Sequence, residues 1–424
     1  MTQQPSPART AETGATTSGW SHGHARQAVV LAGMVLLAFN LRPAVTSLGV
    51  SLDRVQSGLH MSTSVAGVLT TVPVLCFAVF GSVTASITQR LGIHRTALAA
   101  LVTLVGGLTL RSITSSTPVF LVATVLALAG IAVGNVSLPP LVKLHFAGSV
   151  STVTAIYSAA LMGGAAIPSV VTLPVSSSFG SWRAGLAMWA IVAAIAVLPW
   201  LGMLRHDVRR GVTEASAIPL RALLRSRLAW AMAIFFAAQS AAAYAQFGWL
   251  PKIFVDAGAS HEEGAVMLGI VTAVGLPVPL ALPWIMRRVT DQRILVVGFV
   301  SLTVGGFAGV LFSPLSVPWL WALMLGVGGC AFPWTLTMLG LRSHSPQGTA
   351  ALSGFVQGIG YLLAAAGPLG TGLLHSASGG WRVPLVVLMC LGAPMLVAGF
   401  VFARPRFVED DLAIAIRPAP PAHP

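Results

Sequence analysis

Long apolar stretches recur along the whole chain. From residue 27 to residue 403, stretches of 18 or more mostly apolar residues alternate with short polar segments. A helix of about 20 residues rises about 30 Å, which is the thickness of the hydrocarbon layer of a membrane. The pattern therefore predicts twelve transmembrane helices, at residues 27–50, 64–87, 96–113, 118–140, 150–174, 184–203, 229–250, 264–286, 294–312, 318–340, 348–373 and 384–403.

The polar segments divide the chain into parts. Residues 1–26 are rich in Ser, Thr, Pro and Gly and are predicted to form a disordered amino-terminal tail. Residues 27–203 and 228–403 form two bundles of six predicted helices each. A linker with six arginines, residues 204–227, joins the bundles, and a Pro-rich tail, residues 404–424, ends the chain.

The two halves resemble each other at a constant offset. A shift of 199 residues places Trp182 and Arg183 on Trp381 and Arg382. The same shift pairs Lys143 with Arg342, His145 with His344, Gly130 with Gly329 and Asn40 with Gln239. A parallel repeat of six plus six helices is the plan of the major facilitator fold, in which the substrate lies near the midplane between the halves. We therefore predict an all-α membrane protein with the major facilitator fold, its two six-helix bundles related by pseudo-two-fold symmetry.

Composition and charge agree with a membrane protein. Hydrophobic residues make up 55% of the chain and charged residues only 8%, whereas soluble domains carry about 25% charged residues. The net charge of +13 is a matter of topology, because 18 Lys and Arg fall on the side of the termini. Five fall on the other side, namely Arg54, Arg111, Arg183, Lys252 and Arg382. Both termini are thus predicted to be cytoplasmic, and no nucleic-acid partner is expected.

Polar side chains inside the predicted spans are few, and a polar group in hydrocarbon usually has a function. They occur in spans 1, 4, 5, 7 and 11, whereas the interiors of spans 3, 6, 9 and 12 have none. In the major facilitator arrangement the latter four face lipid. The candidate substrate-binding residues are Arg42, Asn40, Asn135, Tyr157, Gln239, Tyr244, Gln246, Trp334, Gln357 and Tyr361. Helix–helix hydrogen bonds for the tyrosines and simple packing for Trp334 are the alternatives.

Arg42 is the strongest of these candidates. It lies about 24 Å along the first span from Arg26, just beyond the midplane. A guanidinium there costs about 2.5–3.5 kcal/mol on insertion scales, and all 11 acidic residues lie in loops or tails. Two interpretations stay open. Arg42 bonds to carbonyls and amide side chains of neighbouring helices, or it faces an aqueous cavity and binds an anionic or electronegative solute.

Other positions are candidates for conformational change. Pro43 weakens the helix beside Arg42, and Gly130 and Gly134 form a small-residue pair that permits close helix packing. Gly354 and Gly358 form a second such pair. No catalytic residue, metal site or cofactor is predicted, because the chain has neither a phosphate-binding loop nor a cluster of metal ligands. No carboxylate is available inside a span to relay a coupled proton, so coupling is left open.

Several motifs resemble those of the cyanate and 2-nitroimidazole transporter family of the major facilitator superfamily. They are residues 40–46 (NLRPAVT), 70–77 (TTVPVLCF) and 130–135 (GIAVGN), followed by Leu138, Pro139, Lys143, Gly180, Trp182 and Arg183. In the loop after span 2, Arg90, Gly92 and Arg95 match the superfamily pattern, whereas Ala85 and Gln89 replace its glycine and its acid.

The resemblance implies a permease of the bacterial inner membrane for a small anionic or polar nitrogenous solute. We expect the protein to be a monomer. The alternative is a multidrug or toxicant exporter of the same fold. A large apolar cavity without a fixed charge would suit an exporter, whereas Arg42 favours a small anion.

Overall fold

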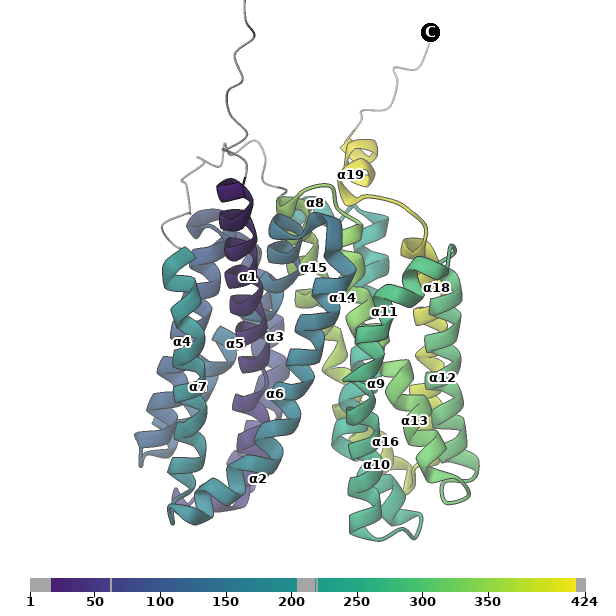
Figure 1. Cartoon of the computed structure of the whole chain (residues 1–424). Coiled ribbons are helices and arrows are strands. Elements are labelled where there is room, and N and C mark those ends of the chain that lie inside the picture. Colours follow the sequence, from purple (N-terminus) through teal and green to yellow (C-terminus); the bar gives the residue numbers. More distant parts are fainter. Residues whose placement is uncertain (1–16, 62, 204–217, 219, 417–424) are drawn as a thin grey trace, which may run out of the picture.

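The structure is a computed structural model that describes residues 17–61, 63–203, 218 and 220–416. Within these residues all regular secondary structure is helical, and the helices form two groups that stand side by side (Figure 1). The first group contains α1 (Thr17–Asn40), α2 (Pro43–Gly58), α3 (Thr63–Leu91), α4 (Ile93–Ile113), α5 (Thr117–His145), α6 (Val150–Ser178) and α7 (Trp182–Met203), with a short 3-10 helix (Ala147–Ser149) before α6. The second contains α8 (Leu220–Leu223), α9 (Arg227–Asp256), α10 (His261–Val274), α11 (Pro277–Arg288), α12 (Arg293–Phe312), α13 (Pro318–Gly329), α14 (Ala331–Leu341), α15 (Pro346–Ala364), α16 (Ala366–Ser378), α17 (Arg382–Cys390), α18 (Gly392–Ala403) and α19 (Val408–Ile416).

The predicted spans correspond to these helices. Eleven helical stretches in the described part of the chain are long and apolar enough to cross a membrane. The second predicted span is α3, a helix of 29 residues with an apolar stretch at Leu75–Leu91. Several spans consist of two consecutive helices, because the chain is interrupted at Arg42, Gly275, Cys330, Ala365 and Leu391.

The break in the first span follows from Pro43. Proline has no backbone N–H and clashes with the preceding turn, so it fits the first turn of a helix and not its interior. Pro43 accordingly begins α2, while α1 ends at Asn40. Leu41 and Arg42 form a turn between the two helices, beside the point where we expected Pro43 to weaken the helix.

The start of α1 and the end of the last helices lie at one face of the molecule, called here the terminal face, and the opposite face is called the far face (Figure 1). Helix α1 begins at Thr17, so the prediction of disorder for residues 17–26 is wrong. Hydropathy marks where a helix enters the membrane, whereas the helix itself continues into water. Most of the linker, residues 204–217, and residues 1–16 and 417–424 of the tails lie outside the described residues.

The two halves approach each other most closely near the terminal face. The main contacts join α3, α5 and α6 of the first half to α11, α14 and α15 of the second. Spans 3, 6, 9 and 12 contribute none of these main contacts, as the distribution of polar residues predicted. At the far face the ribbons of the two halves lie further apart (Figure 1).

Glycines make the approach near the terminal face possible. A Cβ on Gly358 would lie 2.9 Å from Ser82 Cα, and one on Gly340 would lie 2.9 Å from Val150 Cγ1. Gly354 packs in the same way against Ala85. Small residues let helix backbones come close, and here they do so across the boundary between the halves.

Gly130 and Gly134, the pair for which we considered a gating role, pack inside the first half. A Cβ on Gly130 would collide with α4 at the Ala100 carbonyl, and one on Gly134 would press on Leu41. The prediction of close packing is therefore confirmed, whereas neither glycine lies at the boundary that a movement of the halves would change. Gly92, in contrast, has φ +85° and forms the turn between α3 and α4, a conformation that favours glycine.

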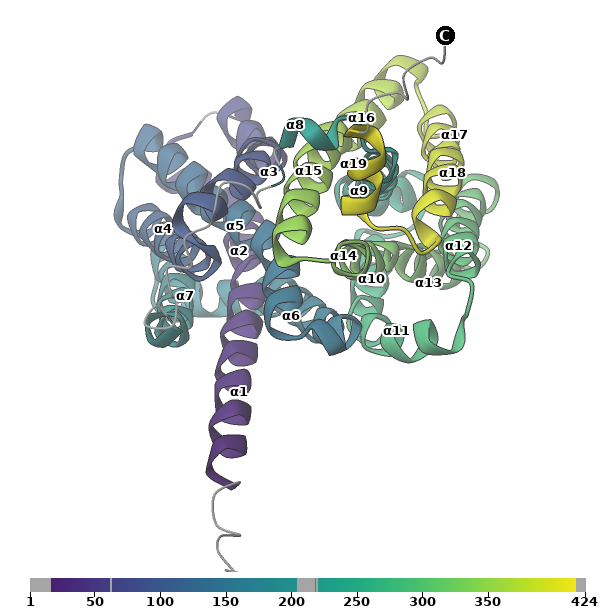
Figure 2. The same cartoon turned by 90° about the horizontal axis from the view of Figure 1, so that it is seen from above.

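The carboxy-terminal helix α19 is attached to the terminal face by its acidic residues. Glu409 accepts hydrogen bonds from the backbone N–H groups of His344 and Ser345 at the start of α15. Asp411 accepts one from the Ser226 hydroxyl (2.6 Å) and one from the Leu228 N–H at the start of α9. Carboxylates at helix amino termini satisfy free N–H groups and complement the helix dipole. Figure 2, seen from above, shows α19 over α9 and beside α15.

Replacing Glu409 with alanine should therefore destabilise the second half. Loss of a helix cap costs about 0.5–2 kcal/mol, which we expect to appear as a lower melting temperature of the purified protein. The matched control is Asp410→Ala, because Asp410 makes only an exposed contact of 3.3 Å with His344, of a kind that contributes about 0–1 kcal/mol. Equal melting temperatures for the two variants would contradict this role for Glu409.

Candidate functional site

A cluster of buried polar side chains joins the two halves midway between the faces. Asn135 of α5 donates hydrogen bonds to Gln357 Oε1 (2.9 Å) and to the Tyr361 hydroxyl (3.2 Å), both on α15. Gln357 Nε2 in turn donates to Ser353 Oγ (2.7 Å), and the Ser353 hydroxyl donates to the Val136 carbonyl (3.0 Å) on α5. Three of the predicted binding residues, Asn135, Gln357 and Tyr361, are thus brought together across the boundary, from positions more than 200 residues apart.

Aromatic rings surround Tyr361. The ring of Phe77 on α3 lies 4.8 Å from it between centroids, and that of Phe236 on α9 lies 4.9 Å away. Tyr244, also on α9, lies 6.3 Å away. These distances are typical of tilted and edge-to-face aromatic pairs. The cluster therefore combines amides, hydroxyls and aromatic faces, drawn from α3, α5, α9 and α15.

Arg42 belongs to the first half, at the break between α1 and α2. Its charge lies within electrostatic range of the Tyr361 hydroxyl on α15 of the second half. The side chain is half-buried, and its buried Nε has no hydrogen-bond partner among the described residues. Among the described residues no carboxylate forms an ion pair with it. The site therefore offers a positive charge with free donors beside polar and aromatic groups.

The other predicted binding residues lie elsewhere. Asn40 donates to the Leu36 carbonyl of its own helix (2.8 Å), and Gln239 Nε2 donates to the neighbouring Ser240 hydroxyl (2.7 Å). Each leaves its amide oxygen buried without a partner. Gln246 is buried on α9, and Tyr157 is fully buried in the core on α6. Among the described residues, none of the four is hydrogen-bonded to the Asn135 cluster.

Trp334 belongs to a separate aromatic core. It is fully buried, its ring packs against Phe235 (5.5 Å) and Phe402 (5.1 Å), and its Nε1–H donates to Gln292 Oε1 (3.4 Å). We considered Trp334 as a cavity residue because of its span. The structure places it inside the second half instead, so packing is the better interpretation.

Two features of the site were not predicted. Phe77 and Phe236 were ordinary apolar residues in apolar spans, and no pattern in a single sequence distinguishes them from packing residues. Arg111 was placed in the group at the far face because it lies near the end of its span. The structure instead buries it completely, with Nη1 donating to the Ala44 carbonyl of α2 (2.8 Å).

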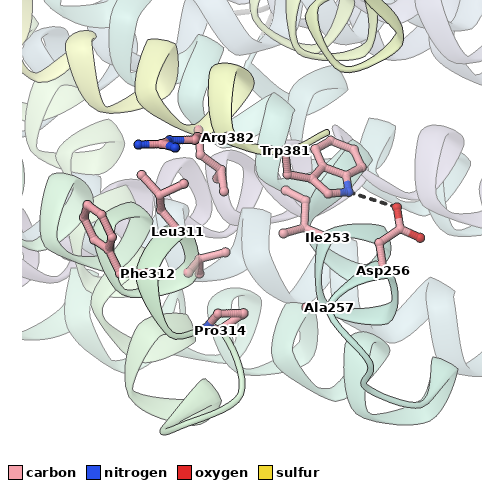
Figure 3. Close-up of a pocket in the computed structure, with 10 residues that line it drawn as sticks. Ile253, Asp256, Ala257, Leu311, Phe312, Pro314, Trp381 and Arg382 are labelled. Carbon is pink, nitrogen blue, oxygen red and sulfur yellow. Dashed lines mark hydrogen bonds between the residues drawn. The ribbon is translucent and has the colours of Figure 1, made fainter. Parts of the chain in front are cut away.

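Pockets at the far face repeat the pseudo-symmetry of the chain. One, of about 650 Å³, is lined by Arg54, Ser57, Trp182 and Arg183 among others, and one of about 450 Å³ by Ile253, Asp256, Trp381 and Arg382. Figure 3 shows the latter, with Trp381 Nε1 donating to Asp256 (2.9 Å). Gly180 and Gly379 form turns just before the Trp-Arg pairs of these pockets, with φ +61° and +68° respectively. Neither pocket includes a residue of the polar cluster.

The comparisons with known proteins establish the family. The model of the Major Facilitator Superfamily matches residues 29–368. The chain belongs to the Major Facilitator Superfamily. Within it, the chain is similar to the 2-nitroimidazole transporter of Escherichia coli (33% identity, covering 90% of this chain and 97% of the relative) and to the cyanate transport protein CynX of the same species (28%, 89% and 97%). It is also similar to an uncharacterized transporter of Bacillus subtilis, YycB (34%, 89% and 94%).

Solved structures of major facilitator proteins share the fold. The transporter FucP, in its outward conformation, matches with a TM-score of 0.71 at 14% identity and covers 89% of this chain and 98% of its own. The proton:xylose symporter XylE matches with a TM-score of 0.71 at 12% identity, covering 93% and 99%. The predicted fold and family are therefore confirmed, and the protein is a multi-pass membrane transporter of a small-molecule substrate, not an enzyme.

Replacing Asn135 with leucine should weaken the contact between the halves. The change leaves Gln357 Oε1 and the Tyr361 hydroxyl without their donor, and hydrogen bonds between membrane helices contribute about 0.6–1.7 kcal/mol each. We expect a lower melting temperature for the purified protein. The control is Thr124→Val on the same helix, because the buried Thr124 hydroxyl donates only to Phe120 within α5. If the control melts lower than Asn135→Leu, the bridge across the halves does not stabilise the structure.

Proposed function

We propose that this transporter moves a small anionic or polar nitrogenous solute, which binds between Arg42 on one side and Asn135, Tyr244, Gln357 and Tyr361 on the other. The observation that carries the proposal is the guanidinium of Arg42. Its Nε has no partner among the described residues, and its charge lies within electrostatic range of Tyr361 in the second half. A guanidinium presents a planar set of N–H donors that suits carboxylate-like and other electronegative groups.

The chemistry around Arg42 supports the same class of solute. Amide and hydroxyl groups of Asn135, Gln357 and Tyr361 can donate to or accept from a small planar molecule. The rings of Phe77 and Phe236 provide flat apolar surfaces beside them. The names of the relatives, which refer to cyanate and 2-nitroimidazole, agree with such a site. A lipophilic solute of an exporter would gain nothing from the charge.

We propose an alternating-access cycle in which this structure represents one of the two end states. The terminal face is taken as cytoplasmic, in the inner membrane of a bacterium, because most Lys and Arg lie on that side. The close glycine contacts between α3 and α15 then close the cytoplasmic side, and the solute enters from the far face. Rocking of one half against the other separates Gly354 and Gly358 from α3 and exposes the site to the cytoplasm. Since no carboxylate lies in the described cluster, a coupled proton would travel on the solute itself.

Replacing Arg42 with glutamine should reduce binding. A charge-assisted hydrogen bond contributes about 1.5–3 kcal/mol, so the dissociation constant should rise about ten- to a hundredfold. The measurements are the thermal shift of the purified protein by cyanate and by 2-nitroimidazole, and uptake of the labelled compounds into proteoliposomes. Arg54→Gln is the matched control, since it removes an exposed arginine from the adjoining helix α2. Unchanged transport by Arg42→Gln, or transport of large lipophilic compounds only, would contradict the proposal in favour of an exporter.

A disulfide between the halves should stop the cycle. Val150→Cys and Gly340→Cys, in a chain whose three cysteines are replaced by serine, place two thiols at a spacing suited to a disulfide, because a Cβ at Gly340 lies 2.9 Å from Val150 Cγ1. Oxidation should hold the terminal face closed, so uptake of the two compounds into proteoliposomes should fall to background and return on reduction. Val150→Cys alone is the control. Wild-type uptake by the fully bridged protein would exclude opening at this point.

A further inference from the structure

A fully buried arginine, Arg111, contacts the start of α2, two residues after Arg42 in the chain. Arg111, in the last turn of α4, is fully buried and contacts α2 through a hydrogen bond of 2.8 Å from Nη1 to the Ala44 carbonyl. Its Nε and Nη2 are also buried and have no hydrogen-bond partner among the described residues. A buried charge that makes one neutral hydrogen bond is costly, so a function for it is expected.

The hydrogen bond from Arg111 to Ala44 lies at the start of α2, where the helical hydrogen bonds of the first span are interrupted. Ala44 is the second residue of α2, and Arg42 is the residue just before that helix. The backbone hydrogen bonds of α1 do not continue into α2, because the N–H groups of Val45 and Thr46 both donate to the Arg42 carbonyl. The first turn of α2 is therefore not held by α1, and Arg111 holds it from another helix.

The described groups around Arg111 do not neutralise its positive charge. On α2, positions 44, 47 and 51 lie on one helical face, because they are three and four residues apart. Ser47 and Ser51 are fully buried there, with hydroxyl groups that have no partner. These groups are neutral, and among the described residues no carboxylate pairs with Arg111. Two guanidinium groups thus flank the start of α2, and an incoming anion meets the charge of both.

We infer that Arg111 is a positioning residue of the solute site: it fixes the first turn of α2, directly after Arg42, and raises the positive potential there. The inference rests on the proposed function and adds a selectivity for anions. A single N–H···O bond to the Ala44 carbonyl requires one donor and one positive charge. A lysine at position 111 can supply both, whereas a glutamine supplies a donor without charge.

The test is a double-mutant cycle between positions 42 and 111, with dissociation constants for cyanate and 2-nitroimidazole measured on the full-length purified protein. Arg111→Gln should weaken binding of cyanate about tenfold, and Arg111→Lys should restore most of the affinity. In the Arg42→Gln background, Arg111→Gln should have a clearly smaller effect, because the group that it positions is gone and only its own charge is lost. Arg54→Gln again serves as the control for loss of a positive charge near α2.

The outcomes distinguish the proposed function from the positioning role of Arg111. If Arg42→Gln alone leaves both dissociation constants unchanged, or the wild type binds neither compound, the proposed function fails and this inference with it. If Arg42→Gln weakens binding but Arg111→Gln weakens it equally in both backgrounds, Arg111 acts independently and only the positioning role is contradicted. Melting temperatures without ligand identify unfolded variants, and should Arg111→Gln not fold, loss of cyanate affinity in a folded Arg111→Lys protein contradicts the inference by itself.

Discussion

The structure depends on an uncompensated positive charge held at mid-depth in the membrane. A guanidinium in this position costs about 2.5–3.5 kcal/mol on insertion scales, unless polar groups or water solvate it. Arg42 meets this constraint at a break between two helices, where Pro43 removes a backbone donor and the chain turns. The second half carries an amide and a hydroxyl on α15, and Tyr361 there lies within electrostatic range of the charge. Irregular backbone at membrane depth is tolerated where protein or a water-filled cavity surrounds it, and this arrangement meets that condition.

The same residues that form the site also hold the halves together. Asn135 bonds to α15 from α5, and Ser353 bonds back from α15 to the Val136 carbonyl. Glycines 354 and 358 allow the helices to approach closely on the side of the terminal face. A solute that competes for the Asn135 amide or the Tyr361 hydroxyl would therefore exchange interhelical bonds for bonds to itself. Binding and the equilibrium between conformations are coupled whenever a ligand interacts differently with the two states.

Much of this arrangement could be predicted from the sequence. Hydropathy located the spans, the scarcity of polar residues separated lipid-facing from central spans, and the absence of intramembrane acids identified Arg42. The predictions that failed share one cause. A single sequence indicates how deep a residue lies in the membrane, but not the direction in which its side chain points. Trp334 had the depth of a cavity residue and packs in an aromatic core. Arg111 had the depth of an interfacial residue, yet its long side chain turns inward and reaches α2. Gly130 had the spacing of a small-residue pair at which the two halves could move, but it packs within its own half.

The internal repeat explains which features are shared between the halves and which are not. Gly180 and Gly379 occupy equivalent positions at an offset of 199 residues, and both turn the chain with positive φ before a Trp-Arg pair. At the same offset Asn135 corresponds to Trp334, and Arg42 to Ala241. The scaffold is thus repeated, whereas the chemistry is divided, with the charge on the first half and the tyrosines around it on the second. A solute bound in the proposed site would contact unlike surfaces, so we expect this asymmetry, not the shared fold, to determine which solute binds.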